Sequence, residues 1–157
     1  MNEERRDARY LERPEQFESE QWMVGLANDP AALYRNVLVE KSFSFAVSVI
    51  NVHKNIIAEK RDFEVARQFV RSGTAIGALI REAQNAESRA DFIHKLGIAQ
   101  KECDETCYWL ELMKETEIVG VDQFNDLHPK SVELLRIIRS SIITSKNRMN
   151  QSKDSLK

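Results

Sequence analysis

Residues 67–83 read RQFVRSGTAIGALIREA, and this stretch decides the fold. Apolar and small residues recur in and just before it at steps of three and four, as on the inner face of a helix packed in a bundle. The predicted inner face consists of Phe63, Ala66, Val70, Gly73, Gly77 and Ile80. A glycine inside a helix costs about 0.5–1 kcal/mol relative to alanine. Two glycines on one face therefore predict that another backbone or a bulky side chain comes very close.

The space beside Gly73 and Gly77 needs large neighbours, since large side chains face small ones in packed bundles. Trp109 and Phe45 are the expected occupants, because both lie in apolar helical segments elsewhere in the chain. These four residues form the predicted close-packing site between helices.

The composition favours one soluble, helical domain. With 157 residues the chain can bury a sizeable core, and its three prolines and five glycines leave long stretches without a turn signal. No apolar run approaches the roughly 18–20 residues that span a bilayer. The opening MNEERRDARYLERPEQ has no apolar segment of the kind that secretory signals carry. We expect a cytoplasmic protein with no membrane partner, and its two cysteines, Cys103 and Cys107, fit reduced thiols there.

Helix start signals divide the chain into segments. Pro30 suits a first helical position after a capping Asp29, and Ser88 precedes another helix with Asp91 three residues on. We predict helices over about 30–59, 63–84, 89–116 and 122–147, which form an all-α, antiparallel up-and-down four-helix bundle at 30–148. A charged extension precedes it at 1–29, and a basic polar tail follows at 149–157. Pro129 either kinks the fourth helix or starts its main part.

The third predicted helix has the most regular apolar repeat. Its positions alternate steps of four and three, as a strict two-position bundle seam does. They are Phe92, Leu96, Ala99, Cys103, Thr106, Leu110 and Met113.

The first predicted helix has more apolar width than one core needs. Beside its inner seam of Leu38, Ser42, Phe45, Val49, Val52 and Ile56 runs a second line that includes Val39, Phe43, Ile50 and Ile57. Extra apolar width indicates a second packing partner, so we expect contact with another subunit or another protein. Trp22, in a short apolar patch of the extension, is a candidate anchor for the same interface. The alternative is that the extension covers this face of its own bundle.

Charge is unevenly distributed. Residues 1–33 hold four Arg and eight Asp or Glu, whereas residues 136–157 hold six Lys or Arg and one Asp. Clustered basic side chains can contact phosphates, although a charge run is more often a solvated face. The candidate contacts to RNA or DNA are Arg136, Arg139, Lys146, Arg148, Lys153 and Lys157.

No residue pattern points to catalysis, a metal or a cofactor. A di-iron bundle needs a Glu-x-x-His pair on each of two helices, and here only Asp91 stands three residues before a histidine, His94. Asp91 suits a helix N-terminus instead, where it faces the helix dipole. Two cysteines alone make no zinc pattern, and Cys103 lies on the predicted core seam. We therefore expect no enzymatic activity and no cofactor.

Three stretches resemble a known family: NVLVEKSFSFAVSVI at 36–50, RQFVRSGTAIGALIREAQNAESRADFIHKLGIAQKE at 67–102, and DETCYWLELM at 104–113. Together they resemble the 23S rRNA intervening sequence proteins, and the related accessory variability determinant of diversity-generating retroelements has a similar bundle. The resemblance implies a four-helix bundle assembled as a ring of five protomers, with no established enzymatic activity. In the retroelement relatives a basic ring surface binds nucleic acid and a reverse transcriptase, whereas residues 34–135 here are slightly acidic.

The sequence favours a non-enzymatic, cytoplasmic, homo-oligomeric bundle protein, and the resemblance implies a pentameric ring. The alternative is a nucleic-acid-binding accessory protein that contacts RNA or DNA through a basic surface and the C-terminal tail.

Overall fold

A computed structural model describes residues 30–60 and 63–154, with side chains for 37–59 and 63–151. The chain divides into two units, Met1–Leu33 and Tyr34–Lys157, and the second holds the bundle. The predicted cap at Asp29 and the predicted anchor Trp22 lie outside the described residues.

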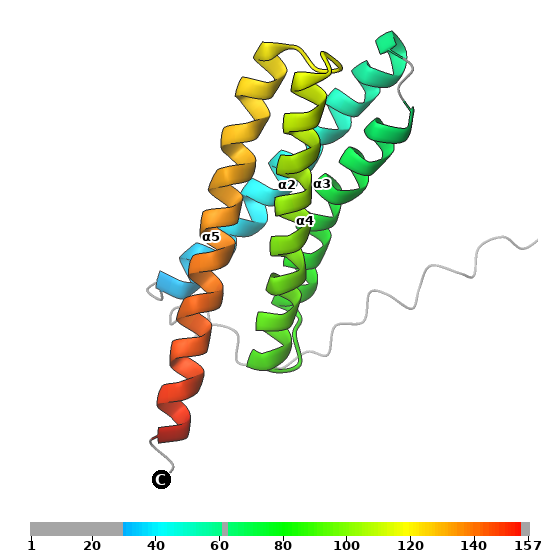
Figure 1. Cartoon of the computed structure of the whole chain (residues 1–157). Helices are drawn as coiled ribbons and strands as arrows, with labels where there is room; N and C mark the ends of the chain where they lie inside the picture. Colours follow the sequence, from blue (N-terminus) through cyan, green and yellow to red (C-terminus); the bar gives the residue numbers. More distant parts are fainter. Residues whose placement is uncertain (1–29, 61–62, 155–157) are drawn as a thin grey trace, which may run out of the picture. The chain divides into compact units, whose positions relative to one another are not determined.

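The described residues form four helices: α2 (Pro30–Lys60), α3 (Phe63–Gln84), α4 (Arg89–Glu115) and α5 (Val121–Asp154). Successive helices run in opposite directions, and α4 lies beside both α3 and α5 (Figure 1). No strand occurs in the ranges described. The predicted all-α four-helix bundle is confirmed.

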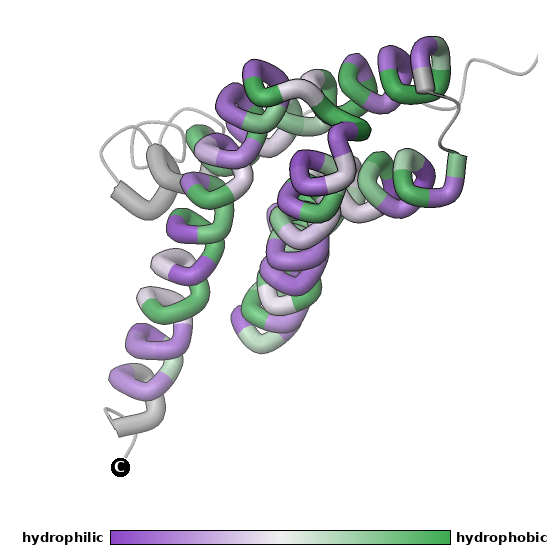
Figure 2. The backbone as a smooth tube through the Cα atoms, turned by 45° about the horizontal axis from the view of Figure 1, so that its top comes forward, coloured by the Kyte–Doolittle hydropathy of each residue, from purple (hydrophilic) through white to green (hydrophobic). Residues whose placement is uncertain are grey.

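The core lies along the inward faces of the four helices. Polar and apolar residues are interspersed along each helix, as expected of helices with one apolar face (Figure 2). The regular repeat of α4 is buried as predicted from Leu96 to Met113, and only Phe92, at its edge, is partly exposed. The inner seam of α2 is likewise buried except for the half-buried Val52.

The buried line of α3 differs from the predicted one. Phe63 is 59% exposed and Val70 is only half-buried. The large core side chains of this helix are instead Phe69 and Ile76. The full buried set is Ala66, Phe69, Ser72, Gly73, Ile76, Ile80 and Ala83. The prediction took the face that contains both glycines as the buried one. The large buried side chains of α3 lie on the neighbouring face.

The two glycines of α3 lie close to α2, as predicted, but the nearest residues are not the predicted ones. A Cβ added at Gly73 would lie 2.8 Å from Cγ1 of Val49, and one at Gly77 would lie 3.4 Å from the carbonyl oxygen of Ser42. Neither Phe45 nor Trp109 supplies the nearest atoms. Phe45 is buried in the core, and Trp109 is half-buried with its indole N–H donating to Glu105 at 3.0 Å.

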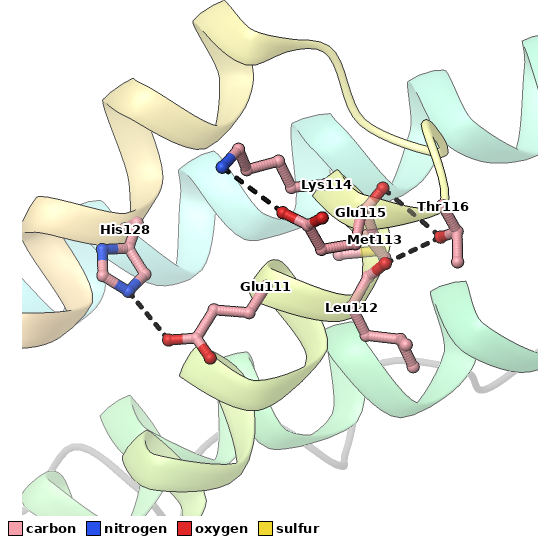
Figure 3. A network of polar contacts seen from close by, with 7 residues as sticks. All are labelled: Glu111, Leu112, Met113, Lys114, Glu115, Thr116 and His128. Atoms are coloured by element: carbon pink, nitrogen blue, oxygen red, sulfur yellow. Dashed lines mark hydrogen bonds and ion pairs between the residues drawn. The ribbon is translucent and has the colours of Figure 1, made fainter.

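Hydrogen bonds at both ends of α4 fix its length. At the start, the backbone N–H of Asp91 donates to the Ser88 hydroxyl at 3.1 Å, so the predicted cap is confirmed. At the end, Ile118 N–H donates to the Met113 carbonyl and Glu117 N–H to the Lys114 carbonyl, at 2.8 and 3.1 Å. This is a Schellman motif. Figure 3 shows the same turn, where the Thr116 hydroxyl donates to the carbonyl of Leu112.

The last helix is longer than predicted. α5 begins at Val121 and contains Pro129 in its interior, so the proline does not start the main helix. The helix also continues to Asp154 rather than to about 147. Residues 149–154 of the predicted tail are therefore helical.

Candidate assembly surface

Three large apolar side chains on one face of α2 are exposed to solvent. Phe43 is 56% exposed, Val47 45% and Ile50 39%. Their spacing of four and three residues places them one above another on the helix surface. We call these three residues the α2 stripe. Scattered apolar side chains on a surface are ordinary, but a row along one helix indicates a face built to pack.

The α2 stripe contains only part of the predicted interface. Phe43 and Ile50 belong to it, whereas Val39 and Ile57 are partly buried and pack against the bundle's own core. Val47 was missed, because it lies beyond the second predicted apolar line, on the side away from the inner seam. Its spacing from Phe43 and Ile50 was the signal that could have found it.

A cation borders the α2 stripe. The guanidinium carbon of Arg81, on α3, lies 5.4 Å from the centre of the Phe43 ring. This cation–π contact holds the ring against α3 and leaves more than half of the side chain in solvent. The stripe therefore presents a positioned aromatic ring at one end and aliphatic side chains at the other.

The predicted nucleic-acid contacts lie on α5, and the side chains of four of them are described. Arg139 pairs with Asp104 at 3.3 Å. Arg136, Lys146 and Arg148 are exposed on α5. The side chains of Lys153 and Lys157 lie outside the described residues.

Other ion pairs involve the part of α5 that precedes these basic residues. Lys130 pairs with Asp126 at 2.7 Å, and Lys41 of α2 reaches Glu133 of α5 at 2.9 Å. The first part of α5, up to Glu133, is therefore mixed in sign, whereas residues 134–151 carry basic and no acidic side chains.

Polar and ring contacts join the end of α4 to the start of α5. The ring of His128 stacks on Phe124 with centroids 4.8 Å apart, and its Nε2 lies 3.3 Å from a carboxylate oxygen of Glu111 (Figure 3). Lys114 lies 4.9 Å from the centre of the Phe124 ring. These contacts hold the start of α5 against α4.

The two thiols lie between α4 and α5. Cys103 is fully buried, and its Sγ lies 3.2 Å from the carbonyl oxygen of Ser131. Cys107, one turn later, is partly exposed, and its Sγ lies 3.1 Å from the Ser131 hydroxyl oxygen. That hydroxyl in turn donates to the carbonyl of His128 at 2.8 Å. One serine of α5 thus contacts both thiols of α4.

No group of three or more metal-ligating side chains comes together among the described residues. Asp91 accepts the backbone N–H of Glu87 at 3.3 Å, which accounts for its place at the start of α4. None of the helices described is long and apolar enough to cross a membrane.

Residues 35–140 match the model of the 23S rRNA-intervening sequence proteins. The chain belongs to this family.

A solved structure that is similar to this chain has the same fold. It is a protein of unknown function from the S23 ribosomal protein family of Bacteroides thetaiotaomicron, 46% identical to this chain, with a TM-score of 0.68. The similarity covers 69% of this chain and 97% of the solved one. A search of curated proteins finds no match.

The part that matches the 23S rRNA-intervening sequence proteins holds the features described above. It includes the α2 stripe, both glycines of α3 and both thiols, and it ends before Lys146 and Arg148. The bundle surface up to residue 140 is therefore the part of this chain shared with the family, whereas the end of α5 lies beyond it.

Proposed function

We propose that this protein is a non-enzymatic assembly protein of the cytoplasm, whose bundle forms a symmetric homo-oligomer through the α2 stripe. The observation that supports it most is the row of exposed side chains Phe43, Val47 and Ile50 on one helix face. Leaving such a row in water forgoes roughly 25 cal/mol for each Å² of apolar surface that a partner would bury.

A second copy of the chain is the partner we favour. The resemblance to ring-forming relatives suggests a five-membered ring. In a closed ring the interface is heterologous, so the stripe of one protomer packs on a different face of the next. The exposed apolar residues on other helices, Phe63, Tyr108 and Ile143, offer such faces.

The test is the mass of the full chain by light scattering coupled to size exclusion. We expect an oligomer whose mass is an integral multiple of 18.2 kDa, with five copies as the expected number. A monomer that persists at high concentration would contradict the assembly.

Two matched variants locate the interface. Val47→Glu places a charge in the stripe and is expected to shift the mass toward the monomer, because a charge is costly to bury at an interface. Val121→Glu makes the same change at a residue that is 63% exposed at the start of α5, and the oligomer should persist. Equal masses for both variants would remove the α2 stripe from the interface.

A second candidate function is binding of RNA or DNA. It is supported by the exposed Arg136, Lys146 and Arg148 on α5 and by the resemblance to the retroelement variability determinant. The pairing of Arg139 with Asp104 and the acidic residues in the first part of α5 make it the weaker proposal.

A gel-shift titration with structured RNA and duplex DNA at two salt concentrations tests this candidate. Binding through phosphates weakens steeply with salt. It should also weaken in Arg136→Ala and on removal of residues 146–157, and remain in Lys101→Ala, which removes an exposed cation from α4. Absence of a salt-sensitive shift would eliminate nucleic-acid binding.

A further inference from the structure

A second regular repeat runs along α4, on the side opposite its buried seam. Its positions also alternate steps of four and three, as in a helix that packs on one further helix. All of them are exposed except Gly97, which is partly buried, because α3 and α5 pack on other sides of α4 (Figure 1). We call this row the outer line of α4. It consists of Ala90, His94, Gly97, Lys101, Asp104, Tyr108, Glu111 and Glu115.

Gly97 has no packing reason inside its own bundle. A glycine in a helix interior destabilises the helix relative to alanine. Gly73 has such a reason, because a Cβ there would collide with Val49. A Cβ at Gly97 would meet no atom within 4 Å among the described residues. The missing side chain instead leaves the backbone of α4 open to close approach from outside the bundle.

Tyr108 is a large side chain held in place on the same line. It is 56% exposed, and its ring lies edge-on to that of Trp109 with centroids 5.1 Å apart. The indole N–H of Trp109 in turn donates to Glu105 at 3.0 Å. Exposed aromatic side chains that are already positioned are favoured at protein interfaces, because little rotational freedom is lost on binding.

The outer line is complementary to itself when its direction is reversed. In two antiparallel helices related by a two-fold axis, residue i of one copy faces residue j of the other, and j faces i. With the axis midway between Lys101 and Asp104, each lysine faces the aspartate of the other copy, and Gly97 faces Tyr108. Further out, His94 faces Glu111 and Ala90 faces Glu115. Each opposed pair thus joins a small residue or a nitrogen donor to a carboxylate or to the tyrosine ring.

We propose that the outer line of α4 binds the outer line of a second copy of the chain, with the two helices antiparallel about a two-fold axis. Tyr108 of each copy packs over Gly97 of the other, and Lys101 pairs with Asp104. This contact is separate from the α2 stripe and does not depend on it. It leaves Phe63 and Ile143 as the exposed apolar residues that the stripe can contact.

The contact is polar, so it is weaker than an apolar interface and sensitive to salt. Asp104 already lies 3.3 Å from Arg139 of its own bundle, but a carboxylate has two oxygens and accepts a second donor. Exposed ion pairs are screened by salt, whereas burial of the apolar α2 stripe is not weakened in this way. The two interfaces therefore respond differently to ionic strength.

Sedimentation equilibrium of the full chain at low and high salt, over a range of concentrations, tests the pairing. Gly97→Leu fills the place that Tyr108 needs and should weaken the salt-sensitive association by at least about tenfold. Asn147→Leu adds the same side chain at an exposed position of α5 and should leave the association unchanged. Equal masses for the native chain and Gly97→Leu at low salt and every concentration would overturn the proposal.

The same measurement separates this contact from the α2 stripe. If the stripe is not an interface, the native chain is a reversible dimer and Gly97→Leu is a monomer. If the stripe is an interface, Gly97→Leu retains the oligomer that the stripe builds, and the native chain forms a heavier species at low salt.

Charge reversals test the register. Lys101→Glu and Asp104→Lys should each abolish the pairing, because like charges then face one another twice across the two-fold axis. A mixture of the two variants should associate, because every contact between unlike copies joins opposite charges again. Circular dichroism shows whether both variants are folded. A mixture of folded variants that is no heavier than either variant alone would refute the two-fold register.

Discussion

Val49 of α2 packs directly on the backbone of Gly73 in α3. A Cβ at position 73 would lie 2.8 Å from Cγ1 and 2.9 Å from Cγ2 of Val49, closer than such atoms approach in folded proteins. Val49 cannot easily turn aside, because its branched side chain has one strongly preferred rotamer in a helix. The absent side chain of Gly73 therefore sets how closely α2 and α3 pack.

The first prediction is that Gly73→Ala lowers the free energy of unfolding by about 1–3 kcal/mol, the usual cost of overpacking a core. Gly97→Ala is the matched control on α4, where an added Cβ meets nothing within 4 Å. It should raise the stability by about 0.5–1 kcal/mol, because alanine is the better helix former. Chemical denaturation of both variants measures the difference, and the same sign for both would refute the contact.

A double variant identifies Val49 as the neighbour that matters. Val49→Ala alone should destabilise by leaving a cavity. Combined with Gly73→Ala, the new methyl group occupies part of that space, so the double variant should be more stable than the sum of the single effects implies. Strict additivity would show that the two residues do not share the space.

The second prediction concerns Gly77, whose added Cβ would lie at 3.4 Å from the Ser42 carbonyl oxygen. That distance is ordinary van der Waals contact, so Gly77→Ala should change stability by less than about 1 kcal/mol. Gly77→Leu forces a large side chain against the backbone of α2 and should cost about 1–3 kcal/mol or more. A normal melting curve for Gly77→Leu would show that the glycine is not needed for packing.

The two glycines also show how far the sequence predicts the packing. Their period predicted a close approach on that face of α3, and α2 does approach there. The neighbour could not be deduced, because the pattern of one helix does not give the register at which a second helix crosses it. Val49 and Phe45 both lie on the inner seam of α2, and only the crossing places Val49 at Gly73.

The candidate surface was predictable to a similar extent. Apolar excess on the first helix predicted an outward face, and Phe43 and Ile50 lie on it. Val39 and Ile57 are less exposed than these two residues because they pack against the core. Their burial depends on the angles between the helices and not on the pattern of α2 alone. The end of α5 was predicted too early. The residues after Lys146 are polar but include no glycine or proline that would end the helix.

The third prediction concerns the buried pair Ser72 and Thr106, whose hydroxyl oxygens lie 3.0 Å apart between α3 and α4. Ser72 can donate instead to the Gln68 carbonyl and Thr106 to the Glu102 carbonyl, each within its own helix, and each hydroxyl has one hydrogen to give. Because each carbonyl already serves the helix backbone, replacing both hydroxyls leaves few groups unpaired. Ser72→Ala with Thr106→Val should therefore cost no more than about 1 kcal/mol.

The single variants provide the control for that pair. A double-mutant cycle by urea denaturation should give a coupling energy below about 1 kcal/mol, as for a neutral hydrogen bond. A loss of several kcal/mol in the double variant would show that the bond between the helices is needed for the fold.

The fourth prediction concerns the turn that ends α4. Glu117 has φ of 56°, in the left-handed region, and occupies the position of the Schellman motif where glycine is preferred. A side chain in this conformation costs roughly 1–2 kcal/mol, so Glu117→Gly should raise the free energy of unfolding by about 1 kcal/mol after the entropy cost of glycine. Lys101→Gly, at an exposed position inside the same helix, should lower it by about 0.5–1 kcal/mol. Both variants place glycine at an exposed position, left-handed at 117 and helical at 101. A destabilised Glu117→Gly would show that the left-handed turn is not a source of strain.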